Sequence, residues 1–507
     1  MIEPGTRPAN EAVQSAPALP VVVEGDHLER AFARAAGTEP TRGNAVRLLL
    51  DSRENFPAWL AAIEAARTYV LFESYIIADD RVGQRFADVL IARARAGVRV
   101  CVLYDWLGST KRRGLWARLR EGGVEVTGFN PPSFDSPLQW LTRDHRKSIV
   151  VDGEIGFVSG LCVSATWEGN PAKKLEPWRD TGVEIRGPAV PELARAFEVV
   201  WRAAGGEPLR LPAPMQSSSL GAAVVRVIAG TPNAGGAYRT DLLVASVAQR
   251  RLWVTDAYFV ATSAYTQALR AAARDGVDVR LLVPGASDIP ALSPLSRVGY
   301  RPLLDAGVRV FEWNGTMLHA KTAVADGRWS RVGSTNLNLA SWMTNYELDV
   351  TIEDATFAQA IEAQYERDLM GATEVVLTRR NRVRSAAPLP GDPETPAHAR
   401  RAVSGSAGRA VAGAASVGSA LGAALTNRRP LGPAEAGLLA TMALATLGIA
   451  ALALFAPRVL AWPVAVLAAW LGIAWGIKAW QLWRRARHGR AGGRVEAPGG
   501  QGSGPRS

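Results

Sequence analysis

One pattern occurs twice in this chain of 507 residues and restricts its fold more than any other feature. Residues 145–153 and residues 319–327 both read His-x-Lys, four residues, Asp, Gly. The six matching residues are His145, Lys147 and Asp152 in the first copy and His319, Lys321 and Asp326 in the second. Alone, one copy would usually be a surface pair or a satisfied core pair. Because the chain has only 5 histidines, two copies in one frame predict a site built from two matching halves.

The segments around the motifs repeat as well. Residues 248–260 resemble residues 65–77, and residues 271–283 resemble residues 92–104. In each half, short apolar runs typical of buried strands alternate with segments of helical periodicity. That alternation is typical of an α/β fold with helices on the sheet faces. We therefore expect two duplicated α/β halves, each with a mixed sheet flanked by helices, that share one cleft.

Changes in composition suggest where these halves begin and end. Pro-, Gly- and Ser-rich runs mark linkers, and Ala/Gly/Ser-rich runs mark tethers. The expected segments are a flexible lead-in at 1–42, the first half at 43–204, a linker at 205–221, the second half at 222–380, a low-complexity tether at 381–433, two transmembrane helices at 434–483 and a basic disordered tail at 484–507.

Two apolar runs near the C-terminus predict a transmembrane helical hairpin. Residues 436–456 and 459–477 contain no charged side chain, and about 20 apolar residues cross a hydrocarbon core of roughly 30 Å. The alternative is a buried hairpin in a soluble domain, but apolar residues surround both helices instead of forming a stripe. Basic residues flank both ends, whereas the turn holds only Arg458. This bias predicts that both ends, and the two halves, face the cytoplasm.

Charge and cysteine content narrow the classes of partner and cofactor. The 58 Lys+Arg against 47 Asp+Glu give a net charge of +11, which favours nucleic acid or an anionic membrane surface. Two cysteines, Cys101 and Cys162, cannot form a disulfide framework, which predicts a reducing compartment. No His/Cys cluster has the spacing of a metal site. We therefore expect no metal and no other cofactor.

The residue types of the motifs suit phosphodiester chemistry. Side chains two apart on a strand share a face, so each motif would present its histidine and its lysine together. One imidazole can attack while the other transfers a proton, because imidazole changes charge near neutral pH. Two ammonium groups can neutralise a phosphodiester anion and the charge that develops on it. Such a site needs no metal ion.

The duplicated HxKxxxxD motif resembles the signature of the phospholipase D superfamily. The resemblance runs from about residue 45 to residue 377 and includes the Gly-Ser-Thr-Asn run at 333–336 and the Asn-Tyr-Glu run at 345–347. With the runs at 43–49 and 178–190, the chain is most similar to bacterial cardiolipin synthases. This implies a phosphatidyltransferase of the bacterial cytoplasmic (inner) membrane that acts on phosphatidylglycerol, with phosphatidylethanolamine as a second candidate. The oligomeric state stays open.

The resemblance also implies roles for individual residues. His145 would form a phosphohistidine, and His319 would protonate the leaving alcohol and then activate the incoming one. The expected phosphate-binding residues are Lys147, Lys321 and Asn336, with Ser334 beside them. Four carboxylates have supporting roles. Glu347 is expected to hydrogen-bond His319, the histidine of its own half, and Asp180 is expected to hydrogen-bond His145. Asp152 and Asp326 are expected to position the loops after the strands.

The two halves differ at one place in this pattern. Cys162 stands where the second half has Asn336, and Ser159 stands where it has Gly333. A thiol is a weaker hydrogen-bond donor than a carboxamide. We therefore expect one phosphate contact fewer in the first half, with all four His and Lys side chains retained.

Other functions stay open at this point. A phospholipase D would pass the same intermediate to water and release phosphatidic acid. A nucleic-acid phosphodiesterase fits the basic charge, but the chain lacks a basic groove interleaved with aromatic residues, and the apolar hairpin favours lipid. A non-enzymatic membrane scaffold is suggested only by Cys162. We therefore expect phospholipid substrates and no nucleic acid.

Overall fold

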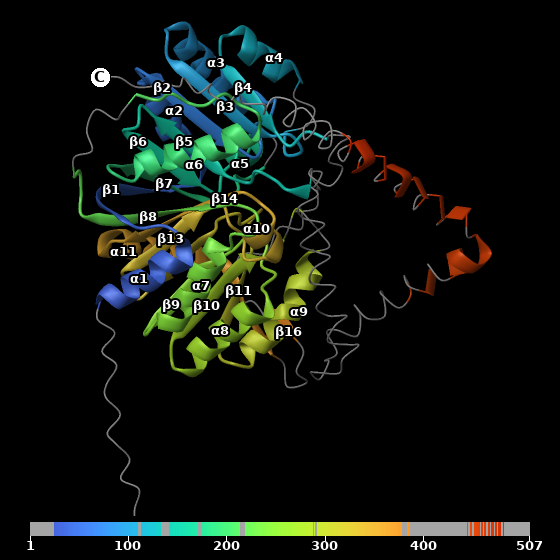
Figure 1. Cartoon of the computed structure of the whole chain (residues 1–507). Helices are drawn as coiled ribbons and strands as arrows, with labels where there is room; N and C mark the ends of the chain where they lie inside the picture. The colour runs from blue at the N-terminus through green and yellow to red at the C-terminus, as the bar shows by residue number, and fades with distance from the viewer. Residues whose placement is uncertain are drawn as a thin grey trace, which may run out of the picture.

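The fold consists of two halves with the same order of elements (Figure 1). The computed structural model describes residues 25–109, 113–132, 141–170, 175–212, 219–286, 288, 292–377 and 383–385, and scattered positions between 444 and 480. The first half comprises β1 (Thr41–Leu50), α2 (Asp51–Glu64), β2 (Tyr69–Ser74), α3 (Arg81–Arg95), β3 (Arg99–Asp105), α4 (Arg113–Glu121), β4 (Glu125–Phe129), β5 (Lys147–Val151), β6 (Ile155–Ser159), α5 (Ala165–Glu168), β7 (Thr181–Arg186) and α6 (Val190–Ala203). The second half comprises β8 (Ala223–Gly230), α7 (Gly236–Val247), β9 (Arg251–Thr255), α8 (Ser263–Arg274), β10 (Asp278–Pro284), α9 (Leu292–Leu304), β11 (Arg309–Trp313), β12 (Thr322–Ala325), β13 (Trp329–Gly333), α10 (Leu339–Met343), β14 (Glu347–Glu353) and α11 (Ala355–Met370).

The strands form one mixed sheet of 16 strands in the order β16-β15-β11-β10-β9-β12-β13-β14-β8-β1-β7-β6-β5-β2-β3-β4, where β15 is Ala372–Leu377 and β16 is Val383–Ser385. Within each half, three strands pair in parallel, β2-β3-β4 and β9-β10-β11. The others pair antiparallel. The antiparallel pair β1–β8 joins the halves at the centre. The predicted α/β class is confirmed, but this pair makes one continuous sheet where we expected one sheet per half.

The central strands are covered on both faces. All six residues of β2 are buried, which is typical of a parallel strand with helices on either side. The helix α3 begins at its N-cap Asp80, whose side chain accepts hydrogen bonds from Val82 N and Gly83 N. Two residues beyond its end, Gly97 has a φ of 88°, which glycine adopts without a Cβ penalty.

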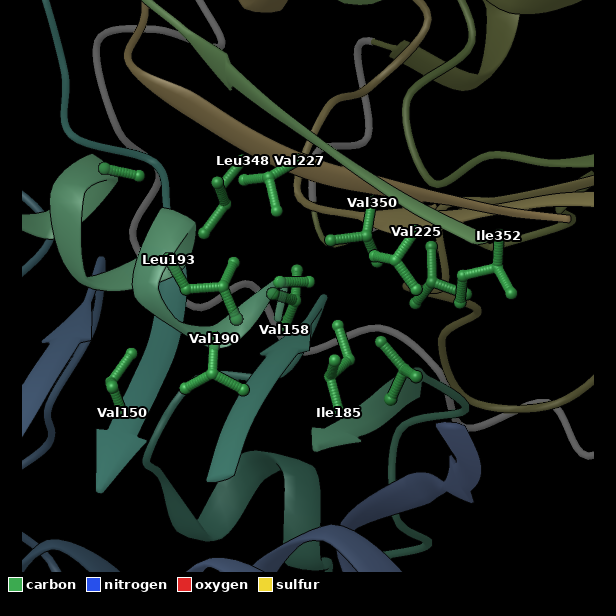
Figure 2. Packing of buried hydrophobic residues seen from close by; sticks show 14 of the residues in the cluster. Val150, Val158, Ile185, Val190, Leu193, Val225, Val227, Leu348, Val350 and Ile352 are labelled. Carbon is green, nitrogen blue, oxygen red and sulfur yellow. The ribbon is translucent and has the colours of Figure 1, made fainter. Parts of the chain in front are cut away.

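The two halves share one apolar core. Figure 2 shows side chains of α6, β6 and β7 facing side chains of β8 and β14. The labelled residues are Val150, Val158, Ile185, Val190 and Leu193 from the first half and Val225, Val227, Leu348, Val350 and Ile352 from the second. Full burial of one such side chain contributes about 1.5–3 kcal/mol. Packing of this extent holds the halves in a defined relative position, which a site shared between them requires.

The flexible lead-in predicted for residues 1–42 is partly wrong. Residues 25–36 form the helix α1 (Gly25–Ala36), and β1 begins at Thr41. The helix packs on α7, with Phe32 in the core of the second half. Glu29 forms an ion pair with the buried Arg226 of β8. The apolar face of this helix therefore has a partner in the second half, far away in sequence.

The predicted C-terminal hairpin lies mostly outside the described residues. Among the residues that the structure does describe, no helix is both long enough and apolar enough to cross a membrane. The tether at 381–433 and the tail at 484–507 lie outside the described residues as well, apart from β16, which pairs with β15.

Candidate active site

Both motifs lie at the entry to a central strand. Lys147 is the first residue of β5, and Lys321 directly precedes β12. Each lysine turns back on its own motif, because its Nζ donates a hydrogen bond to the backbone oxygen of the histidine two residues before it. Lys147 and Lys321 are both buried. The histidine and lysine of each motif therefore lie together, as the spacing predicts.

Each histidine is paired with a carboxylate from the other half. The Nδ1 of His145 lies 2.9 Å from Oε2 of Glu347, and the Nδ1 of His319 lies 2.7 Å from Oδ2 of Asp180. The prediction that Glu347 contacts His319 and that Asp180 contacts His145 is therefore wrong. Both carboxylates do form a hydrogen bond with a histidine, but in each case the histidine belongs to the other half.

Backbone pairing explains the exchange. The N–H of His145 donates to the oxygen of Tyr346, the residue before Glu347. In the same way, the N–H of His319 donates to the oxygen of Arg179, the residue before Asp180. Each motif thus runs beside the acid-bearing segment of the opposite half. Sequence distance could not indicate this, because each acid follows the histidine of its own half by a similar number of residues.

The surroundings keep both imidazoles neutral. Burial lowers the pKa of His145 to about 4, against the raising effect of Glu347. Burial and the Lys321 ammonium lower the pKa of His319 to about 3, against the raising effect of Asp180. Lys147 and Lys321 each lower the pKa of the other half's histidine too. All four groups therefore act within one electrostatic site.

The carboxylates select the tautomer of each ring. Burial alone would raise the pKa of Glu347 and Asp180, but the contacts with the histidines, the lysines and the hydrogen-bond donors Ser334 and Trp167 together outweigh it, and both pKa values are lowered. An ionised carboxylate accepts, so Nδ1 carries the hydrogen and Nε2 has an unprotonated lone pair, which in His319 lies 3.1 Å from Lys321 Nζ. Lys321 Nζ lies 3.0 Å from Nδ1 of His319. The shorter contact with Asp180 decides that Nδ1 donates to the carboxylate.

Further hydrogen bonds hold Glu347 and Asp180 in place. Ser334 donates its hydroxyl hydrogen to Oε2 of Glu347 at 2.6 Å and accepts from Leu348 N. Its only hydrogen is thus used, so the expected phosphate-binding role of Ser334 does not fit this geometry. On the other side, the indole Nε1 of Trp167 donates to Oδ2 of Asp180 at 2.9 Å. Sequence reasoning did not single out Trp167, which lies in the short helix α5.

Asn336 remains suited to a phosphate. It is buried, and its Nδ2 makes only a 3.5 Å contact with Ser341 Oγ. The backbone around it is held by Asp256, which accepts from Leu337 N at 3.0 Å, and by Asp349, which accepts from Thr335 Oγ1. These two carboxylates lie behind the loop, and sequence reasoning gave neither of them this role.

The corresponding loop of the first half is built differently. Cys162 is buried beside the charges of Lys147 and Lys321, and burial raises the pKa of its thiol. Gly160 stands where the second half has Ser334, and a Cβ there would lie 2.2 Å from Oδ1 of Asp180. The two loops thus support their carboxylates by different means.

Aromatic rings surround the histidines unequally. Tyr75 lies edge-on to His145, with ring centroids 5.0 Å apart. His319 has three aromatic neighbours: Trp167 and Tyr258 lie edge-on at 5.2 Å and 5.9 Å, and Trp178 is tilted at 5.6 Å. The rings exclude water and contribute to the low pKa of both imidazoles.

The aspartates of the two motifs do not reach the histidines. Asp152 accepts hydrogen bonds from the backbone N–H groups of residues 67, 68 and 69 and from the Thr68 hydroxyl. Asp326 accepts from the N–H groups of residues 249, 250 and 251. Each aspartate thus ties the turn after its motif strand to the start of the neighbouring strand. Within the described residues, no group of His, Cys, Asp and Glu side chains could hold a metal ion.

The fold and site define a class: proteins with two phospholipase D-like halves and one composite His/Lys site. A solved phosphatidylserine synthase from Haemophilus influenzae has this fold, with a TM-score of 0.53 and 16% identity, covering 68% of this chain and 91% of the other. The family model "Cardiolipin synthase, PLD-like domain" matches residues 244–369.

Two relatives identify the family within this class. Cardiolipin synthase A of Pseudomonas aeruginosa is 38% identical over 361 residues, which cover 70% of this chain and 73% of the relative. A cardiolipin synthase of Alkalihalophilus pseudofirmus is 31% identical, covering 69% of this chain and 72% of the relative. The chain belongs to the cardiolipin synthase family of phospholipase D-type enzymes, as its motifs predict.

Proposed function

We propose that the protein is a membrane-tethered phosphatidyltransferase that makes cardiolipin from phosphatidylglycerol through a phosphohistidine intermediate. One observation carries the proposal: two neutral imidazoles, each oriented by a buried carboxylate of the other half, share one site with two buried lysines. The relatives named cardiolipin synthase supply the substrate class.

In the first step, Nε2 of His145 attacks the phosphorus of phosphatidylglycerol. A P–N bond forms and the P–O bond to the glycerol headgroup breaks, with the proton for the leaving oxygen coming from His319. Lys147, Lys321 and Asn336 hold the non-bridging oxygens and stabilise the charge that grows on them. Glu347 stabilises the charge that His145 acquires when it bonds to phosphorus.

In the second step, a hydroxyl group of another phosphatidylglycerol replaces the histidine. His319, now neutral, takes the proton of that hydroxyl, the new P–O bond forms and the P–N bond breaks. Water in place of the alcohol would give phosphatidic acid, so a phospholipase D is the second candidate function. The aromatic rings around His319 favour the transferase, because apolar surface beside the imidazole that activates the acceptor disfavours water.

A membrane tether supports lipid as the substrate. Most of the described positions between 444 and 480 are helical, and large apolar side chains among them are exposed, for example Phe455 at 88% and Trp462 at 67%. Exposed apolar surface of this kind marks a membrane or protein contact. We propose that residues 434–483 cross the bacterial cytoplasmic membrane twice and keep the two halves on its cytoplasmic side. Deletion of residues 434–507 should then release the protein from the membrane fraction.

Mass spectrometry of lipid products tests the function. The purified chain is incubated with vesicles of phosphatidylglycerol, alone and mixed with phosphatidylethanolamine. Cardiolipin supports the synthase, phosphatidic acid alone supports the lipase, and the absence of both products contradicts the proposal. With phosphatidylethanolamine present, a higher yield of cardiolipin would identify it as a phosphatidyl donor.

The intermediate itself can be trapped. Protein that is denatured with detergent at alkaline pH after reaction with a donor radiolabelled at phosphorus should carry label that is stable to base and labile to acid, as phosphohistidine is. His145→Ala should remove both the label and turnover. Retained turnover in His145→Ala would contradict the assigned nucleophile.

A further inference from the structure

Arg146 lies between the nucleophile and the lysine of the first motif and has no counterpart in the second, where Ala320 takes its place. Its relative exposure is 0%. A fully buried guanidinium costs several kcal/mol unless its donors are satisfied. The contacts of the Arg146 guanidinium therefore indicate its role.

The guanidinium binds three backbone oxygens that belong to both halves. Nε donates to Glu347 O at 3.0 Å, Nη1 to Ala196 O at 2.7 Å and Nη2 to Gly230 O at 2.8 Å. Ala196 belongs to α6 of the first half, whereas Gly230 and Glu347 are opposite each other in the β8–β14 pair of the second. Arg146 also lies over the ring of Tyr346, 5.6 Å from its centroid.

One of these acceptors is the backbone of the residue that orients the nucleophile. The Glu347 side chain pairs with His145, and the Glu347 carbonyl pairs with Arg146. The consecutive residues His145 and Arg146 thus bind the side chain and the backbone carbonyl of Glu347, respectively. We propose that Arg146 is a positioning residue that sets the His145–Glu347 pair, an inference that rests on the proposed role of His145.

A simpler role would be to neutralise buried acids. Arg146 does lower the pKa of Glu73 and of Asp144, which burial raises in both cases. A lysine at position 146 would supply the same charge. It has no planar fork of donors, so it cannot reach three separate carbonyls at once. Arg146→Lys therefore separates a need for charge from a need for geometry.

The test is a double-mutant cycle on kcat with phosphatidylglycerol vesicles. Arg146→Lys should lower kcat about 10- to 100-fold, since misplacement of a catalytic group by about 1 Å has effects of that size. In a Glu347→Gln background, where the pair is already broken, Arg146→Lys should lower kcat less than about threefold. In an Asp180→Asn background, which affects the other histidine, it should retain its full effect.

Two further variants control for folding. Arg226→Lys changes another buried arginine, which pairs with Glu29 on α1, and should leave kcat close to wild type. Arg146→Met removes the charge as well and should behave as Arg146→Lys does in the same cycle. Circular dichroism and thermal unfolding report whether each variant is folded.

Three outcomes would overturn the inference. They are an equal effect of Arg146→Lys with and without Glu347→Gln, wild-type kcat in Arg146→Lys, and loss of the folded state in both Arg146 variants, which would assign the arginine to stability alone. Failure of the proposed function looks different, because the wild-type protein would then form neither cardiolipin nor phosphatidic acid, and failure of the assigned nucleophile would leave His145→Ala active. An inactive His145→Ala with an additive cycle refutes only the role of Arg146.

Discussion

His319 must carry a proton when it acts as an acid, yet its pKa in the free site is about 3. Burial and the adjacent Lys321 cause this low pKa, and Asp180 only partly opposes them. A bound phosphodiester anion places negative charge beside the lysine and so offsets its effect. In the proposed mechanism, substrate binding therefore raises the pKa of His319.

Substrate binding should therefore take up a proton. At pH 6 the ring of His319 is neutral in the free protein. A non-cleavable phosphonate analogue of phosphatidylglycerol should raise the pKa of His319 above the pH of the solution. A pH indicator in weakly buffered solution measures the uptake. His319→Asn should abolish it, and equal uptake by that variant would assign the proton to another group.

The loops that carry Asn336 and Cys162 differ, which suggests that they bind the phosphate with different strength. Asn336→Ala should lower kcat/KM about 10- to 100-fold, because a hydrogen bond to a charged group is worth roughly 1.5–3 kcal/mol. Cys162→Ala should change it less than about threefold, because a thiol is a weak donor. Initial rates on the same vesicles compare the two variants. A larger effect at Cys162 than at Asn336 would reverse this order.

At the level of elements, the turns after the motif strands depend on a carboxylate. Asp152 has a φ of 55° and caps the start of β2. Asp152→Ala should lower the free energy of unfolding by about 2–3 kcal/mol, whereas Asp152→Asn, which keeps an acceptor and tolerates this φ, should cost less. The folded protein of either Asp152 variant should have a kcat within about threefold of the wild-type value.

Acid sensitivity provides a further check on Asp152. The hydrogen bonds lower its pKa in the folded state despite partial burial. Its stabilisation is therefore complete above the unfolded pKa of about 3.9 and is lost as pH falls through the lower folded pKa. The difference in stability between wild type and Asp152→Ala, from denaturant titrations, should shrink below pH 4. A constant difference down to pH 2 would argue against ionic hydrogen bonding.

Most elements and both His/Lys pairs could be predicted from sequence, because periodicity and repetition are local signals. The repeated segments at 65–77 and 248–260, for example, contain the strands β2 and β9. The exchange of Glu347 and Asp180 could not be predicted, since it depends on which backbone segments pair across the halves. For the same reason α1 was missed, because its partner α7 lies about 200 residues away.

The whole molecule contains one complete site in one chain. Both histidines and both carboxylates come from the same chain, and the halves share a core. Mixing His145→Ala with His319→Ala should therefore give no more cardiolipin than either variant alone. Recovery of activity on mixing, after size-exclusion chromatography of the mixture, would show instead that two chains exchange halves.

The crossed pairing also has a consequence for protein synthesis. Glu347 lies 202 residues after His145, an interval of about 10–40 s at a ribosomal rate of about 5–20 residues per second. During this time the histidine of the first motif lacks the carboxylate that orients it. The crossed pairing therefore delays completion of the His145–Glu347 pair until translation has passed residue 347.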